Sequence, residues 1–167
     1  MLNPLSAPKV YEAFIYSLPE RYPTIRRSTL VYIASGVYFG RVEGMIFFDQ
    51  TIILCVEEFL NFELGVIEGY GYEVTRPHSA LNVLSFPVTA NYCRANYPHM
   101  DKLYWYDPFP HPHIPALAST HPHHKHVHPD IKHNRIPAPE LSFTTPNLPF
   151  LLEEVQQTFL LTSNIGN

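Results

Sequence analysis

Apolar residues recur along this chain with two different periods, and each period predicts one kind of secondary structure. Near the N-terminus they recur at the spacing of one helical face, at Val10, Phe14, Ile15 and Leu18. Pro8 suits the first turn of a helix, and Pro19 disfavours helical geometry at the residue before it. The pattern therefore predicts a helix over residues 8–18.

From residue 29 onward, the apolar residues follow the patterns of strands. Five segments rich in β-branched and aromatic residues stand between turn signals, at residues 29–34, 37–48, 51–57, 66–75 and 103–106. The links between the first four are short and polar, which favours hairpins and an antiparallel meander. Residues 57–64 are ambiguous, because they fit either a short helix or the end of the third strand.

The remaining segments complete the predicted fold. Residues 77–101 fit the strand pattern badly and indicate an insertion between strands. A closing helix is expected after Thr145 or Asn147, since both are good N-cap residues and Pro149 suits a first turn. We therefore expect an α+β fold in a single domain, residues 1–167. It has an antiparallel sheet of about five strands, an N-terminal helix and a C-terminal helix.

Histidine and proline are concentrated between Asp107 and His133. Eight of the ten histidines lie there, at His111, His113, His121, His123, His124, His126, His128 and His133. Proline lacks a backbone donor and disfavours helical geometry at the residue before it. The segment is thus expected to be an extended connector, neither a helix nor a central strand. Imidazoles titrate near neutral pH and bind metals, so this is the expected centre of any chemistry.

The densest part of the connector suggests acid–base catalysis. In an extended backbone, alternate side chains share a face, which places His124 and His126 on one side and His123 and Lys125 on the other. A neutral and a charged imidazole can accept and donate the protons of phosphoester cleavage, and an ammonium group can stabilise the transition state. We expect His124 and His126 to form this pair and Lys125 to stabilise the phosphorane. Asp107 would orient one imidazole, and the catalytic residues His111 and His123 would converge with them in one concave site.

The same residues also suit a metal site. Imidazoles from His121, His123, His124 and His126, with Asp107 or Asp130, could bind a divalent transition metal such as zinc, whereas the acid–base mechanism needs no cofactor. The spacing matches no standard metal motif. A further alternative is a surface segment that binds metal or a partner protein without catalysing a reaction.

Charge and composition limit the remaining possibilities. The formal charge of −4 argues against binding nucleic acid by bulk charge alone. Cys55 and Cys93 are expected to be free thiols in a reducing cytoplasm. No apolar run approaches the ~20 residues that span a membrane, and the N-terminus lacks the pattern of a signal peptide. We therefore expect a soluble, cytoplasmic protein with no membrane contact.

Two motifs resemble a known family. The sequence LYWYDPFPHPH, followed by THPHHKHV, resembles the TumE-type toxins of toxin–antitoxin systems. The resemblance rests on Tyr106-Asp107, on His111 and His113, and on residues 122–126. It extends over residues 28–160 as a toxin-like core that excludes the insertion at 77–101, and the long histidine-rich form is similar to a group common in cyanobacteria. It implies a cytoplasmic toxin with a cognate antitoxin.

The leading hypothesis is a toxin that cleaves RNA as a metal-independent ribonuclease. Arg26 and Arg27 are candidates for phosphate contacts, although a solvated basic link explains them equally well. Tyr104 and Tyr106 are candidates for stacking on RNA bases, with burial in the core as the alternative. The competing hypothesis is a non-enzymatic module that uses its histidines to bind metal or another protein.

Overall fold

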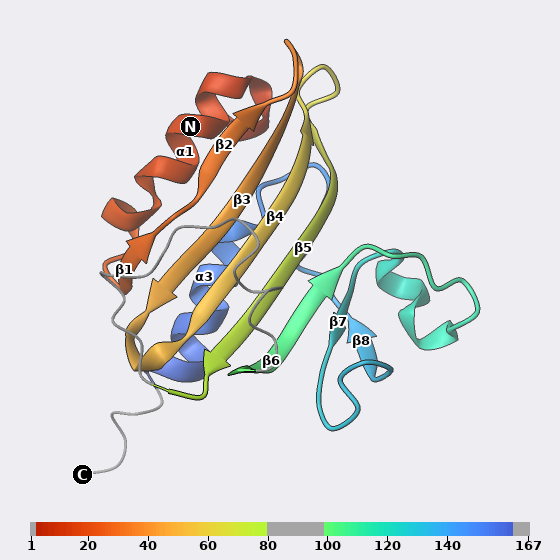
Figure 1. Ribbon diagram of the computed structural model, residues 1–167. Helices are drawn as coiled ribbons and strands as arrows, with labels where there is room; N and C mark the ends of the chain where they lie inside the picture. Colours follow the sequence, from red (N-terminus) through yellow and green to blue (C-terminus); the bar gives the residue numbers. More distant parts are fainter. Residues whose placement is uncertain (1–2, 80–98, 162–167) are drawn as a thin grey trace.

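The computed structural model describes residues 3–79 and 99–161, and its centre is an antiparallel sheet (Figure 1). The sheet has eight strands in the order β1-β3-β4-β5-β6-β7-β8, with β2 pairing to β3 beside β1. Their bounds are β1 Ile25–Ser28, β2 Val31–Ala34, β3 Phe39–Phe48, β4 Ile53–Asn61, β5 Val66–Pro77, β6 Met100–Asp107, β7 His124–His126 and β8 Arg135–Pro137. The α+β class and the antiparallel meander are confirmed, but the prediction of about five strands is wrong.

The additional strands are short segments that carry little apolar signal. β1 has the sequence IRRS and pairs with the end of β3 through its backbone. β7 and β8 have three residues each. β7 lies between β6 and β8, so the expectation that the histidine segment contains no central strand is also wrong. Residues 123–128 contain no proline, and their backbone donors are therefore available for pairing.

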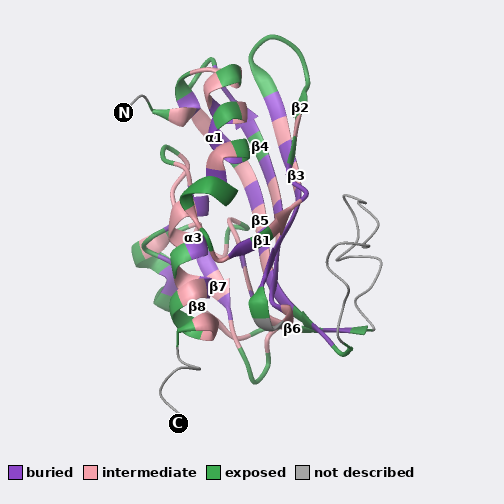
Figure 2. Ribbon diagram, turned by 90° about the vertical axis from the view of Figure 1, so that its left-hand side faces the viewer, coloured by how far each residue is buried: buried purple, intermediate pink, exposed green. Residues whose placement is uncertain are grey.

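Two helices cover one face of the sheet (Figures 1 and 2). α1 spans Pro8–Arg21 and α3 spans Leu148–Val155, followed by a π-helical turn at Gln156–Leu160. The prediction that α1 ends at Leu18 is wrong by three residues. Pro19 lies in the last turn, where it costs one hydrogen bond, and the buried stripe holds the helix in place. That stripe consists of Tyr11, Phe14, Ile15 and Leu18.

Most of the core lies between these helices and the sheet. Side chains of β3 to β6 on this face pack with α1 and α3, including Val42, Leu54, Tyr72, Tyr104 and Tyr106. Alternation along the strands sends the other side chains to the opposite face. There, Met45, Phe47, Ile53 and Met100 form a smaller cluster with Cys55. The sheet thus separates two environments, and β6 and β7 contribute side chains to both.

Gly44 allows β1 and β2 to share one neighbouring strand. Its φ is +141°, and a Cβ at this position would lie 2.5 Å from the main-chain oxygen of Thr29. The Thr29 hydroxyl accepts a hydrogen bond from the Met45 N–H at 3.0 Å. β2 pairs with β3 on one side of Gly44 and β1 on the other. This strand is therefore irregular at a position that requires glycine.

Three shorter segments complete the description. Single 3₁₀ turns occupy Pro4–Ser6, Asp49–Thr51 and Pro115–Thr120. The ambiguous residues after 57 continue β4 to Asn61, and a turn with Gly65 at φ +67° follows. Most of the expected insertion, residues 80–98, lies outside the described residues. Among those described, no helix is long and apolar enough to cross a membrane.

One expectation about the cysteines is also corrected. Cys55 lies in β4 and is disulfide-bonded, so it is not the expected free thiol. Cys93 lies outside the described residues.

Candidate functional site

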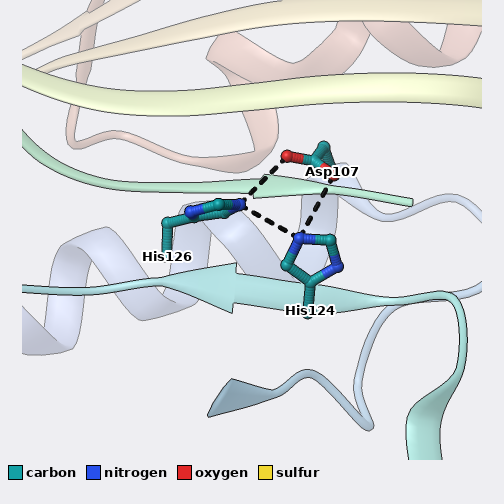
Figure 3. A group of neighbouring side chains, drawn as sticks. All are labelled: Asp107, His124 and His126. Atoms are coloured by element: carbon teal, nitrogen blue, oxygen red, sulfur yellow. Dashed lines mark hydrogen bonds and ion pairs between the residues drawn. The ribbon is translucent and has the colours of Figure 1, made fainter. Parts of the chain in front are cut away.

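Strand pairing brings Asp107, His124 and His126 together. β6 and β7 run antiparallel, with Asp107 opposite His124 and Trp105 opposite His126. Paired residues share a face of the sheet, so all four side chains lie on the face away from α3. Figure 3 shows the carboxylate and the two imidazoles pointing toward one another from the neighbouring strands.

The three side chains contact one another closely. The two Nε2 atoms of His124 and His126 lie 3.0 Å apart. Nε2 of His124 is 3.3 Å from Oδ1 of Asp107, and Nε2 of His126 is 3.2 Å from Oδ2. The imidazoles are almost fully buried, whereas the Asp107 side chain is 28% exposed. Solvent and ligands can therefore reach the cluster past the carboxylate.

Backbone groups fix the orientation of both imidazoles. Nδ1 of His124 donates to the carbonyl of Pro122, and Nδ1 of His126 donates to the carbonyl of Ile131, each at 3.0 Å. The His126 ring also stacks on Trp105, with ring centroids 3.9 Å apart. The burial and the hydrogen bonds together leave each ring little freedom to rotate.

The carboxylate is held in its ionised form. Burial alone would raise the pKa of Asp107, but hydrogen bonds from His126 and from the Phe109 N–H outweigh it. The positive charge of His124 and the Trp105 indole act in the same direction, and the pKa falls to about 2. The Asp107 carboxylate is therefore negatively charged throughout the physiological pH range.

His124 tends toward its neutral form. Burial lowers its pKa from the ordinary value, and the charges of His126 and Arg135 act the same way. The carbonyl of Pro122 and the Asp107 carboxylate raise the pKa but do not compensate. A buried imidazole with a free Nε2 lone pair is suited to accept a proton or to bind a metal ion.

Of the other expected catalytic residues, His111 lies beside the cluster and His123 does not. The His111 ring is 4.9 Å from the His124 ring, centroid to centroid. Burial and the charge of Arg135 lower its pKa. His123 instead stacks on Tyr70, and its Nδ1 lies 2.7 Å from the tyrosine hydroxyl. It also packs against Phe143 in the main core.

Lys125 lies on the opposite face from the cluster. Its Nζ donates to Oε1 of Glu154 at 2.5 Å and lies 3.8 Å from the centre of the Tyr104 ring. Its neighbours on this face are the core aromatics and the end of α3. The structure therefore does not bring Lys125 to the imidazoles whose reaction it was expected to assist.

The residues expected to bind substrate also lie elsewhere. Tyr104 and Tyr106 are 6% and 2% exposed and belong to the main core, so neither is available for base stacking. Arg26 forms two hydrogen bonds with Asp49. Arg26 and Arg27 are in β1, five strand positions from β7 and thus roughly 24 Å away. The expectation that they contact a phosphate held at the cluster is not supported.

Two residues near the cluster were missed in the sequence. Trp105 lies two residues before Asp107, and strand alternation alone could have placed both side chains on one face. Arg135 pairs with His126 across β7 and β8, and its charge acts on both His111 and His124. No sequence signal indicated Arg135, because β8 is too short to be recognised.

The other histidines and Asp130 lie outside the cluster. Nε2 of His128 donates to the carbonyl of Lys102 at 2.8 Å. His133 pairs with Asp130, and both side chains are about two-thirds exposed. His113 and His121 are exposed. Among the residues that the structure describes, the cluster that could hold a metal ion consists of Asp107, His124 and His126. The expected alternative ligands His121 and His123 are not part of it.

Comparison with known proteins identifies a family. The family model described as Toxin TumE matches residues 17–159 of the 167-residue chain. No curated protein and no solved structure matches the chain. The match includes both strands that form the cluster and α3 behind them. The chain therefore belongs to the TumE toxin family.

Proposed function

We propose that this chain is the toxin of a toxin–antitoxin system and that it cleaves RNA at the Asp107–His124–His126 cluster. Membership of a toxin family supports the first part and implies a cognate antitoxin as partner. The proposal that RNA is cleaved at this cluster rests on one observation. Two buried imidazole nitrogens and a carboxylate meet within 3.0–3.3 Å at a position that solvent can reach.

The reaction itself explains why such a cluster is suitable. Cleavage at the ribose 2′-hydroxyl needs a group that removes the hydroxyl proton and a group that protonates the leaving oxygen. It also needs positive charge near the phosphate oxygens. The cluster can supply the first of these, because its Nε2 lone pairs are free of the backbone and point to one place.

Because the two imidazoles lie so close together, one of them cannot serve the attacking oxygen while the other serves the leaving oxygen. In an in-line displacement the attacking and leaving oxygens lie on opposite sides of phosphorus. A proton-transfer group must lie within about 2.6–3.2 Å of its own oxygen. Two Nε2 atoms 3.0 Å apart that face each other leave no room for a phosphate between them. We therefore assign the cluster to the attacking hydroxyl and His111 to the leaving oxygen.

Neighbouring residues offer contacts for the rest of the substrate. Phe109 is 66% exposed and follows Asp107 by two residues, so a base can stack on its ring. Arg135 lies beside His126 and is the candidate for a phosphate contact. These two residues take the roles first expected of Tyr106 and of Arg26 and Arg27.

The test combines growth with purified components. Induced expression of the wild type should arrest growth, and the purified protein should cleave RNA. His124→Ala and His126→Ala should each lower the cleavage rate by at least about 10²-fold, the lower range for one proton-transfer group. His128→Ala is the control, because this residue lies nearby and its side chain is directed to the Lys102 carbonyl, away from the cluster.

The outcomes separate this proposal from its alternative. Equal cleavage by the wild type and His124→Ala would remove the cluster from the reaction. Growth arrest without cleavage of any RNA would place the toxic activity on another substrate. A non-enzymatic metal-binding or interaction module is the second candidate, favoured by the chemistry of the same three ligands. It predicts no cleavage of RNA and no growth arrest, whether or not the cluster holds a metal ion.

A further inference from the structure

The two imidazoles of the cluster are held in one tautomer. A main-chain carbonyl can only accept a hydrogen bond, so the Nδ1 atoms that contact Pro122 and Ile131 both carry hydrogen. When neutral, His124 and His126 therefore present bare lone pairs at Nε2. Histidines that bind metal ions are held in this way, with the second ring nitrogen donating to a carbonyl or carboxylate.

The carboxylate is oriented by similar contacts. Oδ1 of Asp107 accepts a hydrogen bond from the Phe109 N–H at 2.9 Å. Oδ2 accepts one from the Trp105 indole at 3.1 Å. Both donors come from within two residues of Asp107, so the local backbone sets the direction of the carboxylate. Each oxygen retains a further lone pair for the imidazole that it faces.

With both imidazoles neutral, the Nε2 atoms and the two carboxylate oxygens form a group of acceptor atoms with no donor between them. The three contacts, at 3.0, 3.2 and 3.3 Å, join Nε2 to Nε2 and each Nε2 to a carboxylate oxygen. One added proton can satisfy only one of them. Ligands at about 2.1 Å from a metal ion lie roughly 3.0 Å apart at octahedral angles and 3.4 Å apart at tetrahedral angles. The observed distances fall within that range.

We propose that Asp107, His124 and His126 bind a divalent transition-metal ion. Two nitrogens and one carboxylate oxygen favour zinc, manganese, iron, cobalt or nickel over magnesium and calcium, which prefer oxygen ligands alone. Three protein ligands leave positions open for water or for an oxygen of a substrate. The exposed edge of Asp107 is the route by which such a ligand would enter. The proposal stands on this geometry and does not depend on RNA being the substrate. If the ion is bound during RNA cleavage, its open position for water would supply the base that removes the hydroxyl proton, in place of a free Nε2.

The competing explanation is adventitious binding by the histidine-rich surface. His113, His121, His128 and His133 are exposed and lie outside the cluster. A variant that replaces these four residues by alanine removes the exposed imidazoles of the histidine-rich segment and leaves the cluster intact. Asp107→Asn is the opposite change, since it keeps the size of the side chain and removes its charge. His124→Ala removes a ligand outright.

The experiment measures metal binding directly. The full chain is stripped with a chelator, dialysed and titrated with Zn²⁺ by calorimetry, with Mg²⁺ as the comparison. We expect one tight site in the wild type and in the four-alanine variant, and much weaker binding of Mg²⁺. Changes to residues that only support a ligand weaken metal binding by 10–100-fold. Asp107→Asn and His124→Ala should therefore weaken binding of Zn²⁺ by about 100-fold or more.

Each other result overturns the proposal. Loss of the tight site in the four-alanine variant would assign binding to the surface histidines. A tight site that persists in Asp107→Asn would exclude the carboxylate as a ligand, and a wild type that binds no stoichiometric Zn²⁺ would exclude the cluster as a metal site. Circular dichroism without metal checks that each variant is folded, and Asp107→Asn decides the question if His124→Ala is not. RNA cleavage is not used, so a failed proposal about the reaction leaves this result unchanged.

Discussion

Replacing Lys125 with methionine should destabilise the fold while leaving the chemistry of the cluster in place. Nζ of Lys125 donates to Glu154, and both side chains are only 17% exposed. The Tyr106 hydroxyl donates to the same oxygen at 2.7 Å. Without the ammonium group, the largely buried Glu154 carboxylate would keep the Tyr106 hydroxyl as its donor and lose the charge that neutralises it.

The magnitude follows from these contacts. Removing one partner of a buried ion pair costs about 3–5 kcal/mol, and a cation over an aromatic ring contributes about 0.5–2 kcal/mol. Because the pair is partly exposed, we expect a loss of about 3 kcal/mol in the free energy of unfolding. For a chain of this size, that corresponds to a decrease in Tm of about 6–12 °C. Replacing Glu154 with leucine as well should recover most of the loss, since the orphaned charge is then gone.

Urea denaturation followed by circular dichroism measures this change. Lys132→Met is the matched control, because Lys132 is exposed, and its stability should stay within about 0.5 kcal/mol of the wild type. RNA cleavage by the folded fraction of Lys125→Met should be close to that of the wild type. An unchanged stability together with lost cleavage would refute this reasoning and assign Lys125 to the reaction.

Three further predictions concern other parts of the molecule. Gly44→Ala should lower the free energy of unfolding, measured in urea, by about 1–3 kcal/mol, because φ is +141° and the added Cβ would clash with the Thr29 backbone. Unchanged stability would contradict this. The buried Glu58 carboxyl accepts hydrogen bonds from Tyr11 and Tyr72, but burial still raises its pKa in the folded state. Its contribution to the free energy of unfolding is therefore complete below the unfolded pKa and is lost as pH rises through the raised folded pKa. The free energy of unfolding of Glu58→Gln should depend less on pH across that interval. Parallel pH dependence of stability in the wild type and the variant would count against the idea. Zn²⁺ at 100 times its Kd should stabilise the wild type by about 2.7 kcal/mol, a rise in Tm of about 5–11 °C by scanning fluorimetry, and an equal rise for Asp107→Asn would disagree with the proposed ligands.

The parts of the fold that could be predicted are those with a long, regular apolar pattern. Residues 37–48 and 66–75 were expected to be strands, and they include all of β3 and most of β5. β1 was missed, because Arg26, Arg27 and Ser28 look like a polar link and the strand is held by backbone pairing with β3. β7 and β8 were missed because each has only three residues and proline dominates the composition around them.

The candidate site was partly predictable for a similar reason. Asp107 at the end of a strand and the alternation of His124 with His126 were visible in the sequence, and these three residues do meet. Alternation could not tell which face would be buried against α3. That depends on Glu154, which binds Lys125 from 29 residues away. Alternation already separates Lys125 from the two histidines and places Trp105 beside Asp107; the tertiary contact decides that the face of Lys125 is the one packed against α3.

The rate of RNA cleavage by Asp107→Asn tests the central claim most directly. This variant keeps the shape of the side chain and removes the charge that faces both imidazoles. Measured against the wild type at equal folded concentration, we expect a rate at least about 10²-fold lower, comparable to the loss of a catalytic proton-transfer group. A variant that remains folded and cleaves RNA as fast as the wild type would contradict the assignment of the active site to this cluster.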